Sequence, residues 1–198
     1  NSESNAEIQW SDIAPEKGFD IQISAMGYGA NDLNQDGLLD YCMTDNLDRL
    51  LCLYSAGELG YYQAGVAEGF VVDPTKIDGA PDFWYSRELE GVYVQWSGWS
   101  LIMEDINNDG WIDIASTGGQ PPDFGSVKYS RVVEFQPDWM WIGSQDGFYD
   151  LDYSHSFYES SNMYGMASGD LDHDGYRELI KVPQSGNPQI LNNPCSDG

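Results

Sequence analysis

Three short acidic segments of this chain place side-chain oxygens at one repeated spacing. Each spans nine residues, over 32–40, 105–113 and 170–178, with Asp or Asn at positions 1, 3 and 5, glycine at position 6 and Asp or Glu at position 9. Such oxygens, with a free carbonyl at position 7 and a glycine for the sharp turn, form the ligand set that Ca²⁺ prefers. Three copies that also share an apolar residue at position 2 favour calcium sites over solvated acidic turns.

Two other metals match these loops less well. Magnesium prefers a tight octahedron and keeps several waters, whereas each loop offers four side chains and a carbonyl. Zinc would need softer ligands, and the sequence holds only two histidines, His155 and His173. His173 occupies position 4 of the third loop, which points outward, so we expect a surface imidazole there.

Composition and charge bound the class of protein. The chain has 198 residues, of which 41% are hydrophobic and 14% aromatic, enough for a packed core. Its 33 acidic and 8 basic residues give a formal charge of -25, so a nucleic-acid backbone or an anionic membrane surface would repel it. We expect neither partner, and no apolar stretch is long enough to span a membrane.

Two observations favour a secreted protein, extracellular or at the cell surface. Loops that lack a bidentate glutamate at position 12 fit the weaker calcium sites of extracellular modules. The first residues, Asn1 to Glu7, lack the regions of a secretory signal, so the sequence looks like a mature or trimmed chain.

Cysteine spacing agrees with an oxidising compartment. Cys42 and Cys52 lie in two β-prone runs, and a hairpin centred on Leu47 would bring the two sulfurs opposite each other. We predict a cross-strand disulfide, the alternative being two buried free thiols. Cys195 has no predicted partner within the chain.

The loops belong to a larger repeat, because they start at residues 32, 105 and 170. A small-residue or apolar run precedes each loop and a β-prone run follows it. Helix-loop-helix calcium sites need ten or more helix-forming residues after the loop, but turn signals arrive here within about seven. We therefore predict strands on both sides. The expected first strands are 24–30, 98–103 and 163–169, the second 40–44, 112–117 and 179–182, the third 49–54, 132–142 and 189–191, and the fourth 60–63 and 147–151.

Four short antiparallel strands per repeat predict an all-β fold of β-propeller blades. The chain then holds about three blades in a single propeller segment, with units of about 20–72, 92–155 and 160–198 and with residues 7–13 as a shared or completing strand. Three blades do not close a propeller, which takes four or more. Further blades or neighbouring subunits must therefore cover the open edges.

The loops and the strands around them resemble the FG-GAP or VCBS repeats of calcium-binding propellers, which also form the head of integrin alpha chains. A closer resemblance is to cartilage-acidic-protein-like proteins of the ASPIC/UnbV type. It rests on Thr44-Asp45-Asn46, on Arg49 to Tyr54 and on Gly60 to Gln63. The segment from Leu191 to Gly198 is similar to the start of that family's C-terminal module, which implies that the chain is part of a larger protein.

The resemblance also implies a ligand set for about three Ca²⁺ ions. Glu178 departs from the usual aspartate at position 9, and Ser55 to Glu58 replace an asparagine-rich turn. The implied ligands are the side chains of Asp32, Asn34, Asp36 and Asp40, of Asp105, Asn107, Asp109 and Asp113, and of Asp170, Asp172, Asp174 and Glu178, together with the carbonyls of Leu38, Trp111 and Tyr176.

For function, the sequence favours a binding or adhesion module without catalysis, which presents loop surfaces to a protein or carbohydrate ligand. A second reading is a structural subunit that polymerises into rings or filaments through open blade edges. A third is a polysaccharide-acting enzyme, although nucleophile elbows and phosphate-binding glycine loops are absent from the sequence. Acids in reserve for such an enzyme are Glu88, Glu90 and Glu134, and a sugar platform could be built from Trp96, Trp99, Trp139 and Trp141, which otherwise pack between blades.

Overall fold

The described part of the chain is all-β and forms three antiparallel sheets. The computed structural model describes residues 10–45, 50–63, 97–119, 138–146, 150–152, 157 and 162–193. Neighbouring strands are consecutive in the sequence in every sheet, so each sheet is a meander. Sheet 1 holds β1 (Ala25–Asn31), β2 (Asp40–Asp45), β3 (Leu50–Ser55) and β4 (Tyr61–Gln63); sheet 2 holds β5 (Gly98–Glu104), β6 (Asp113–Gly118), β7 (Trp139–Ile142) and β8 (Asp150–Asp152); sheet 3 holds β9 (Met163–Gly169), β10 (Glu178–Pro183) and β11 (Gln189–Leu191).

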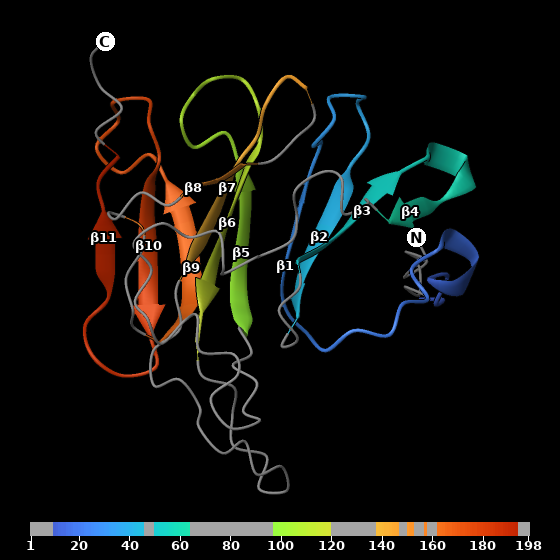
Figure 1. Ribbon diagram of the computed structural model, residues 1–198, viewed down its shortest axis with the longest axis horizontal. Coiled ribbons are helices and arrows are strands. Elements are labelled where there is room, and N and C mark those ends of the chain that lie inside the picture. Colours follow the sequence, from blue (N-terminus) through green and yellow to red (C-terminus); the bar gives the residue numbers. More distant parts are fainter. Residues whose placement is uncertain are drawn as a thin grey trace, which may run out of the picture.

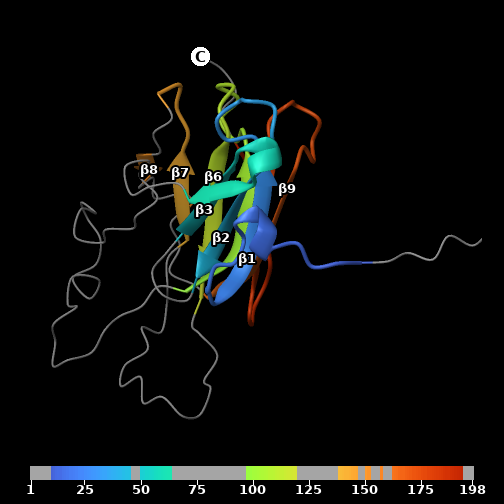
Figure 2. The ribbon, with the colours of Figure 1, turned by 90° about the vertical axis from the view of Figure 1, so that its right-hand side faces the viewer.

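The sheets pack beside one another in chain order. The first strand of each sheet makes most of the contact, because β5 contacts β1 and β2, and β9 contacts β5 and β6. In Figure 1 the order runs from sheet 1 on the right to sheet 3 on the left, and Figure 2 shows the sheets one behind another. The three acidic loops join the first and second strands and lie at the same, upper edge (Figure 1).

Strands follow the loops, as the turn signals predict. Short β-prone runs that end in Asp45, Gly118 or Pro183 are too short for a helix, and they pair in register with the strands before the loops. A register shift occurs near the start of each first strand, between Ala25 and Tyr28 in β1 and between Gly98 and Ser100 in β5. The predicted parts at 46–49, 132–137 and 147–149 lie outside the described residues.

The N-terminal segment differs from the expectation of a shared strand. Residues 10–13 belong to no strand, and residues 7–9 lie outside the described part. Among the described residues, sheet 3 has three strands. Residues 10–13 lead into the short helix η1 (Pro15–Lys17), which lies against sheet 1. Phe19 fixes this position, because its ring packs edge-on against Tyr41 and Tyr61 with centroids 5.4 and 4.6 Å away. A second short helix, η2 (Gly57–Leu59), precedes β4.

Sheets 1 and 2 share a core of large side chains. Trp139 and Trp141 from β7 are 1% and 0% exposed and pack with Leu101 and Met103 of β5. Glycine makes the close approach of β1 possible, because a Cβ on Gly27 would meet the carbonyl oxygen of Trp99 at 2.6 Å. Burial of Trp139 and Trp141 confirms their packing role and removes them from any sugar-stacking surface. Trp96 lies outside the described residues.

A buried ion pair joins sheets 2 and 3. Lys181 Nζ lies 2.7 Å from Asp138 Oδ2, and both side chains are fully buried. The ammonium also donates to the carbonyl oxygen of Phe157 and lies 4.9 Å from the centroid of its ring. The other Asp138 oxygen accepts the backbone N–H of Gly118. This network replaces apolar contact at one end of the interface, whereas Ile102, Met140 and Leu179 fill the rest.

The predicted disulfide between Cys42 and Cys52 is present in the structure. The two residues are directly paired across β2 and β3 and are 0% and 1% exposed. Both side chains face sheet 2, where they belong to its shared core. The disulfide therefore fixes the register of the hairpin and fills the sheet interface.

Replacing both cysteines by alanine should lower the free energy of unfolding by about 3 kcal/mol, the value for releasing a ten-residue loop. Urea denaturation of the double variant and the parent, each with and without reductant, measures the loss. Reductant should weaken the parent and leave the double variant unchanged. A parent midpoint equal to that of the variant in oxidising buffer would contradict the prediction.

In the described part of the chain, no helix has the length and apolar character needed to cross a membrane.

Candidate metal centre

The three acidic loops share one backbone conformation. At position 4, Gln35, Asn108 and His173 have φ of 58, 57 and 64°, and at position 6 the glycines have φ between 86 and 93°. Both values lie in the left-handed region, which glycine adopts without steric cost and other residues adopt rarely. The glycine predicted to turn the backbone does so in each loop, and a strained position 4 recurs beside it. The repeat therefore extends from sequence to local geometry.

In the first two loops, the carboxylate at position 1 holds the turn together. Asp32 Oδ1 accepts the N–H of Asp36 at 3.0 Å, and Asp32 Oδ2 accepts that of Gly37 at 2.8 Å. Asp105 makes the same two bonds to positions 5 and 6 of the second loop. These N–H donors orient each carboxylate within its turn and leave some of its lone pairs free for a further partner.

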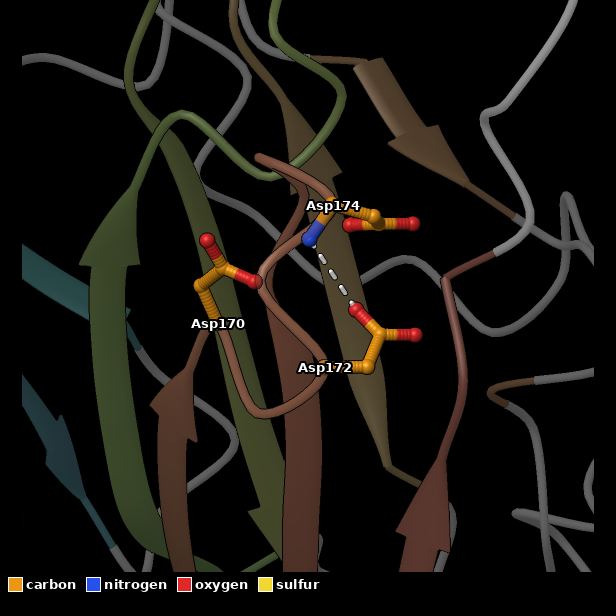
Figure 3. Close-up of side chains that lie close together, drawn as sticks. All are labelled: Asp170, Asp172 and Asp174. Atoms are coloured by element: carbon orange, nitrogen blue, oxygen red, sulfur yellow. Dashed lines mark hydrogen bonds between the residues drawn. The ribbon is translucent and has the colours of Figure 1, made fainter.

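The third loop brings together the largest number of carboxylates. One oxygen from each of Asp170, Asp172 and Asp174 lies within 4.8 Å of the others, and Figure 3 shows the three side chains around the same turn. Asp174 donates its N–H to Asp172 Oδ1 at 3.2 Å. Like charges this close repel each other unless a cation lies between them.

Two buried oxygens of the third loop test whether a cation fits. Asp170 Oδ1 and Glu178 Oε1 have no hydrogen-bond partner among the described residues, and Glu178 is 3% exposed. A buried carboxylate oxygen without a donor is costly, and a hard cation would satisfy it. The donor set of this loop therefore fits Ca²⁺, and the longer Glu178 at position 9 keeps an oxygen free for it.

Position 9 lies deeper than the other predicted ligands. Asp40 and Asp113 are both 0% exposed, and each joins the start of its loop to the end of the third strand. Asp40 accepts the N–H of Leu33 at 2.9 Å and of Ser55 at 2.8 Å. Asp113 accepts the backbone N–H groups of Ile106 and Gly143 in the same way. Position 9 thus anchors the loop to its sheet, a role that the ligand pattern does not reveal.

Neighbouring loops are also bonded to each other. Gln35 at position 4 of the first loop donates to the carbonyl oxygen of Gly110 at position 6 of the second, at 2.6 Å. Asn108 donates to the carbonyl oxygen of Gly175 in the third loop at 3.0 Å. One rule, from position 4 to position 6 of the next loop, therefore links all three. The amide side chains at position 4 were the only sequence signal for these links.

Burial perturbs the position 9 carboxyls. It raises the pKa of Asp113 from 3.8 to about 6, against the opposing hydrogen bonds from Gly143, Ile106 and Asn107. Burial likewise raises the pKa of Asp40, although the N–H groups of Ser55 and Leu33 oppose the shift. Without a cation, both carboxyls bind a proton more readily in the folded state than in the unfolded state.

Calcium-free protein should therefore lose stability as the pH rises from about 4 to about 7. A raised folded pKa stabilises the fold at low pH, and that contribution disappears as the pH passes the folded value. For Asp113 we expect the free energy of unfolding to be about 1 kcal/mol lower at pH 7 than at pH 5. Urea denaturation of calcium-depleted protein measures it. Asp113→Asn should reduce this slope, and an equal slope in both proteins would contradict the assignment.

No protein-family model matches the chain, and a search of curated proteins finds no match. The site therefore rests on its own geometry. Of the predicted side-chain ligands, the structure places all twelve in or beside the three turns. The carbonyls of Leu38, Trp111 and Tyr176 stay a prediction as ligands.

Proposed function

We propose that the chain is a calcium-stabilised segment of a β-propeller that acts outside the cell as a binding or adhesion module without catalysis. One observation carries the proposal: three loops with the same left-handed residues at positions 4 and 6 lie at one edge of three packed sheets, and the third holds two buried oxygens that lack donors. Four-stranded meanders that pack face to face are the architecture of propeller blades. The resemblance to FG-GAP and VCBS repeats supports the same class.

Three ions are the expected complement. In each loop, positions 1, 3, 5 and 9 and the position 7 carbonyl would hold one Ca²⁺, which offsets the mutual repulsion of the carboxylates. The role of the ion would be structural, because Ca²⁺ has one accessible oxidation state and the loop oxygens would serve as its ligands. Disulfide formation between Cys42 and Cys52 is consistent with an oxidising, extracellular location.

Calorimetric titration with Ca²⁺ tests the proposal. We expect three sites in the parent chain and two in Asp109→Ala. Asp146→Ala is the matched control, because Asp146 is an exposed aspartate outside the loops, and it should retain three. Absence of calcium heat, or equal affinity for Mg²⁺, would contradict the proposal.

The rival functions have different support. An enzyme would depend on Glu88, Glu90 or Glu134, and these acids lie outside the described residues. A self-assembling subunit is favoured by exposed apolar side chains on the outer sides of sheets 1 and 3, among them Tyr28 and Ile190.

A further inference from the structure

Loop position 2 covers the next sheet in the series, and only the last copy is exposed. Leu33 is 4% exposed in the core between sheets 1 and 2, and Ile106 is 7% exposed in the core between sheets 2 and 3. Their equivalent in sheet 3, Leu171, is 50% exposed. The side chain that is buried at both interior interfaces thus lacks a covering sheet at the end of the series.

The same end of the series exposes an apolar sheet surface. Val182 of β10 is 45% exposed and Ile190 of β11 is 64% exposed, whereas Thr44 and Thr117, which occupy the position of Val182 in sheets 1 and 2, are 0% exposed. Ile190 is paired with Ile180, and Ile180 with the exposed Ala167. These residues and Leu171 form what we call the forward face of sheet 3.

Sheet 1 exposes part of the complementary set at the other end. Phe19 already covers Tyr41, the equivalent of the buried Ile114, but it leaves β1 and the first loop open. Tyr28 of β1 is 76% exposed, although its equivalent Leu101 in sheet 2 is 8% exposed against sheet 1. Leu39 at loop position 8 is 55% exposed. The same position in sheet 2 is Ile112, which packs on the core shared with sheet 1. We call the surface around Tyr28 and Leu39 the rear face of sheet 1.

Side-chain sizes on the two faces match as they do inside the series. At the interface between sheets 1 and 2, Gly29 of β1 receives Met103 and Leu101 of β5. On the forward face, β9 presents the small residues Gly165 and Ala167 at the positions that Gly27 and Gly29 occupy in β1. Tyr28 is the large residue that a following sheet would lay against them.

The links between loops also stop at both ends. His173 occupies position 4 of the third loop, is exposed and has the left-handed conformation of Gln35 and Asn108. An imidazole N–H can donate as their amides do. A link of the same kind from His173 would need the carbonyl oxygen of a position 6 glycine as its acceptor. Gly37, at position 6 of the first loop, is exposed and carries such a carbonyl.

We propose that the forward face of one copy packs on the rear face of a second copy, at β1 and the first loop beside the segment of Phe19, so that sheet 3 is followed by sheet 1 of the other copy. His173 would then donate to the carbonyl oxygen of Gly37 of the other copy. The contact joins different surfaces of the two copies, so it is heterologous and leads to rings or filaments. It names a partner for the proposed binding module and depends on sheet packing, whether or not the loops hold metal.

Net charge opposes this contact and sets its conditions. Each copy carries a formal charge of -25, and bound calcium or added salt weakens the repulsion between copies. We therefore expect assembly to strengthen with ionic strength, which is the behaviour of an apolar contact between like-charged proteins.

Sedimentation velocity with calcium and about 0.5 M salt tests the proposal across a range of protein concentrations. The parent chain should form species larger than a monomer. Leu171→Asp on the forward face and Tyr28→Asp on the rear face should each raise the dissociation constant at least about tenfold. Gln145→Asp is the matched control, because it adds the same charge at an exposed position after β7, in the interior sheet 2, and it should assemble like the parent.

Mixing the two face variants gives the sharpest result. Each retains one intact face, so Leu171→Asp and Tyr28→Asp should form a one-to-one heterodimer although each alone is monomeric. Circular dichroism and melting curves check that both are folded, and Ile190→Asp replaces Leu171→Asp if the latter is not. A monomeric parent, or a mixture that stays monomeric, would overturn the assembly and leave the calcium titration as a separate result.

Discussion

Removing calcium with EDTA should lower the melting temperature of the chain by on the order of 20 °C. At free calcium a hundredfold above the dissociation constant, each site adds about 2.7 kcal/mol by mass action, so three sites add about 8 kcal/mol. Whole domains are stable by only about 5–15 kcal/mol. The physical cause is the self-repulsion of the carboxylates, which is greatest around Asp170, Asp172 and Asp174.

Substitutions in a single loop should show how much each loop contributes to the fall in melting temperature caused by EDTA. Asp109→Ala removes one ligand from the second loop and should abolish about one third of the EDTA effect, as measured by thermal unfolding with and without chelator. Asp146→Ala, outside the loops, should preserve all of it. If EDTA left the melting curve of the parent chain unchanged, the proposed structural role of calcium would be wrong.

Lys181→Met should lower the free energy of unfolding by about 3–5 kcal/mol, because it leaves the buried Asp138 carboxylate without its counter-ion. Chemical denaturation of the calcium-loaded protein measures the loss. Combining Lys181→Met with Asp138→Asn removes the uncompensated charge and should recover part of the loss, because the new amide oxygen can still accept the N–H of Gly118.

A second ion pair at the same sheet interface provides the control. Arg177 Nε lies 3.1 Å from Glu104 Oε2, but the Arg177 side chain is 46% exposed. Solvent screens such a pair, so Arg177→Met should cost less than about 1 kcal/mol. Equal losses for Lys181→Met and Arg177→Met would show that burial does not set the strength of these pairs.

Local features of this chain could be predicted from its sequence. The strands on both sides of each loop follow from short β-prone runs and nearby turn signals, and the pairing of Cys42 with Cys52 follows from their equal distance from Leu47. The turn at position 6 follows from the conformational freedom of glycine. Each of these depends on residues that are close in sequence.

Features that join different sheets could not be predicted in this way. Lys181 and Asp138 are 43 residues apart, and neither has a periodic pattern that points to the other. The buried oxygen of Glu178 depends on the depth of position 9, which the spacing of ligands does not encode. Residues 10–13 precede a segment whose Phe19 packs on sheet 1, and the β-prone character of the run gives no sign of that contact.

The hydrogen bonds that run from Gln35 to Gly110 and from Asn108 to Gly175 have a consequence for how the loops would fill. An ion that orders one turn also restrains the backbone of the neighbouring turn. The neighbouring turn then loses less conformational entropy when its own ion binds. Thermodynamic reciprocity then requires that binding of the second ion raises the affinity of the first site by the same factor. The three turns would respond to rising calcium as one cooperative array, with a steeper isotherm than independent sites of equal affinity.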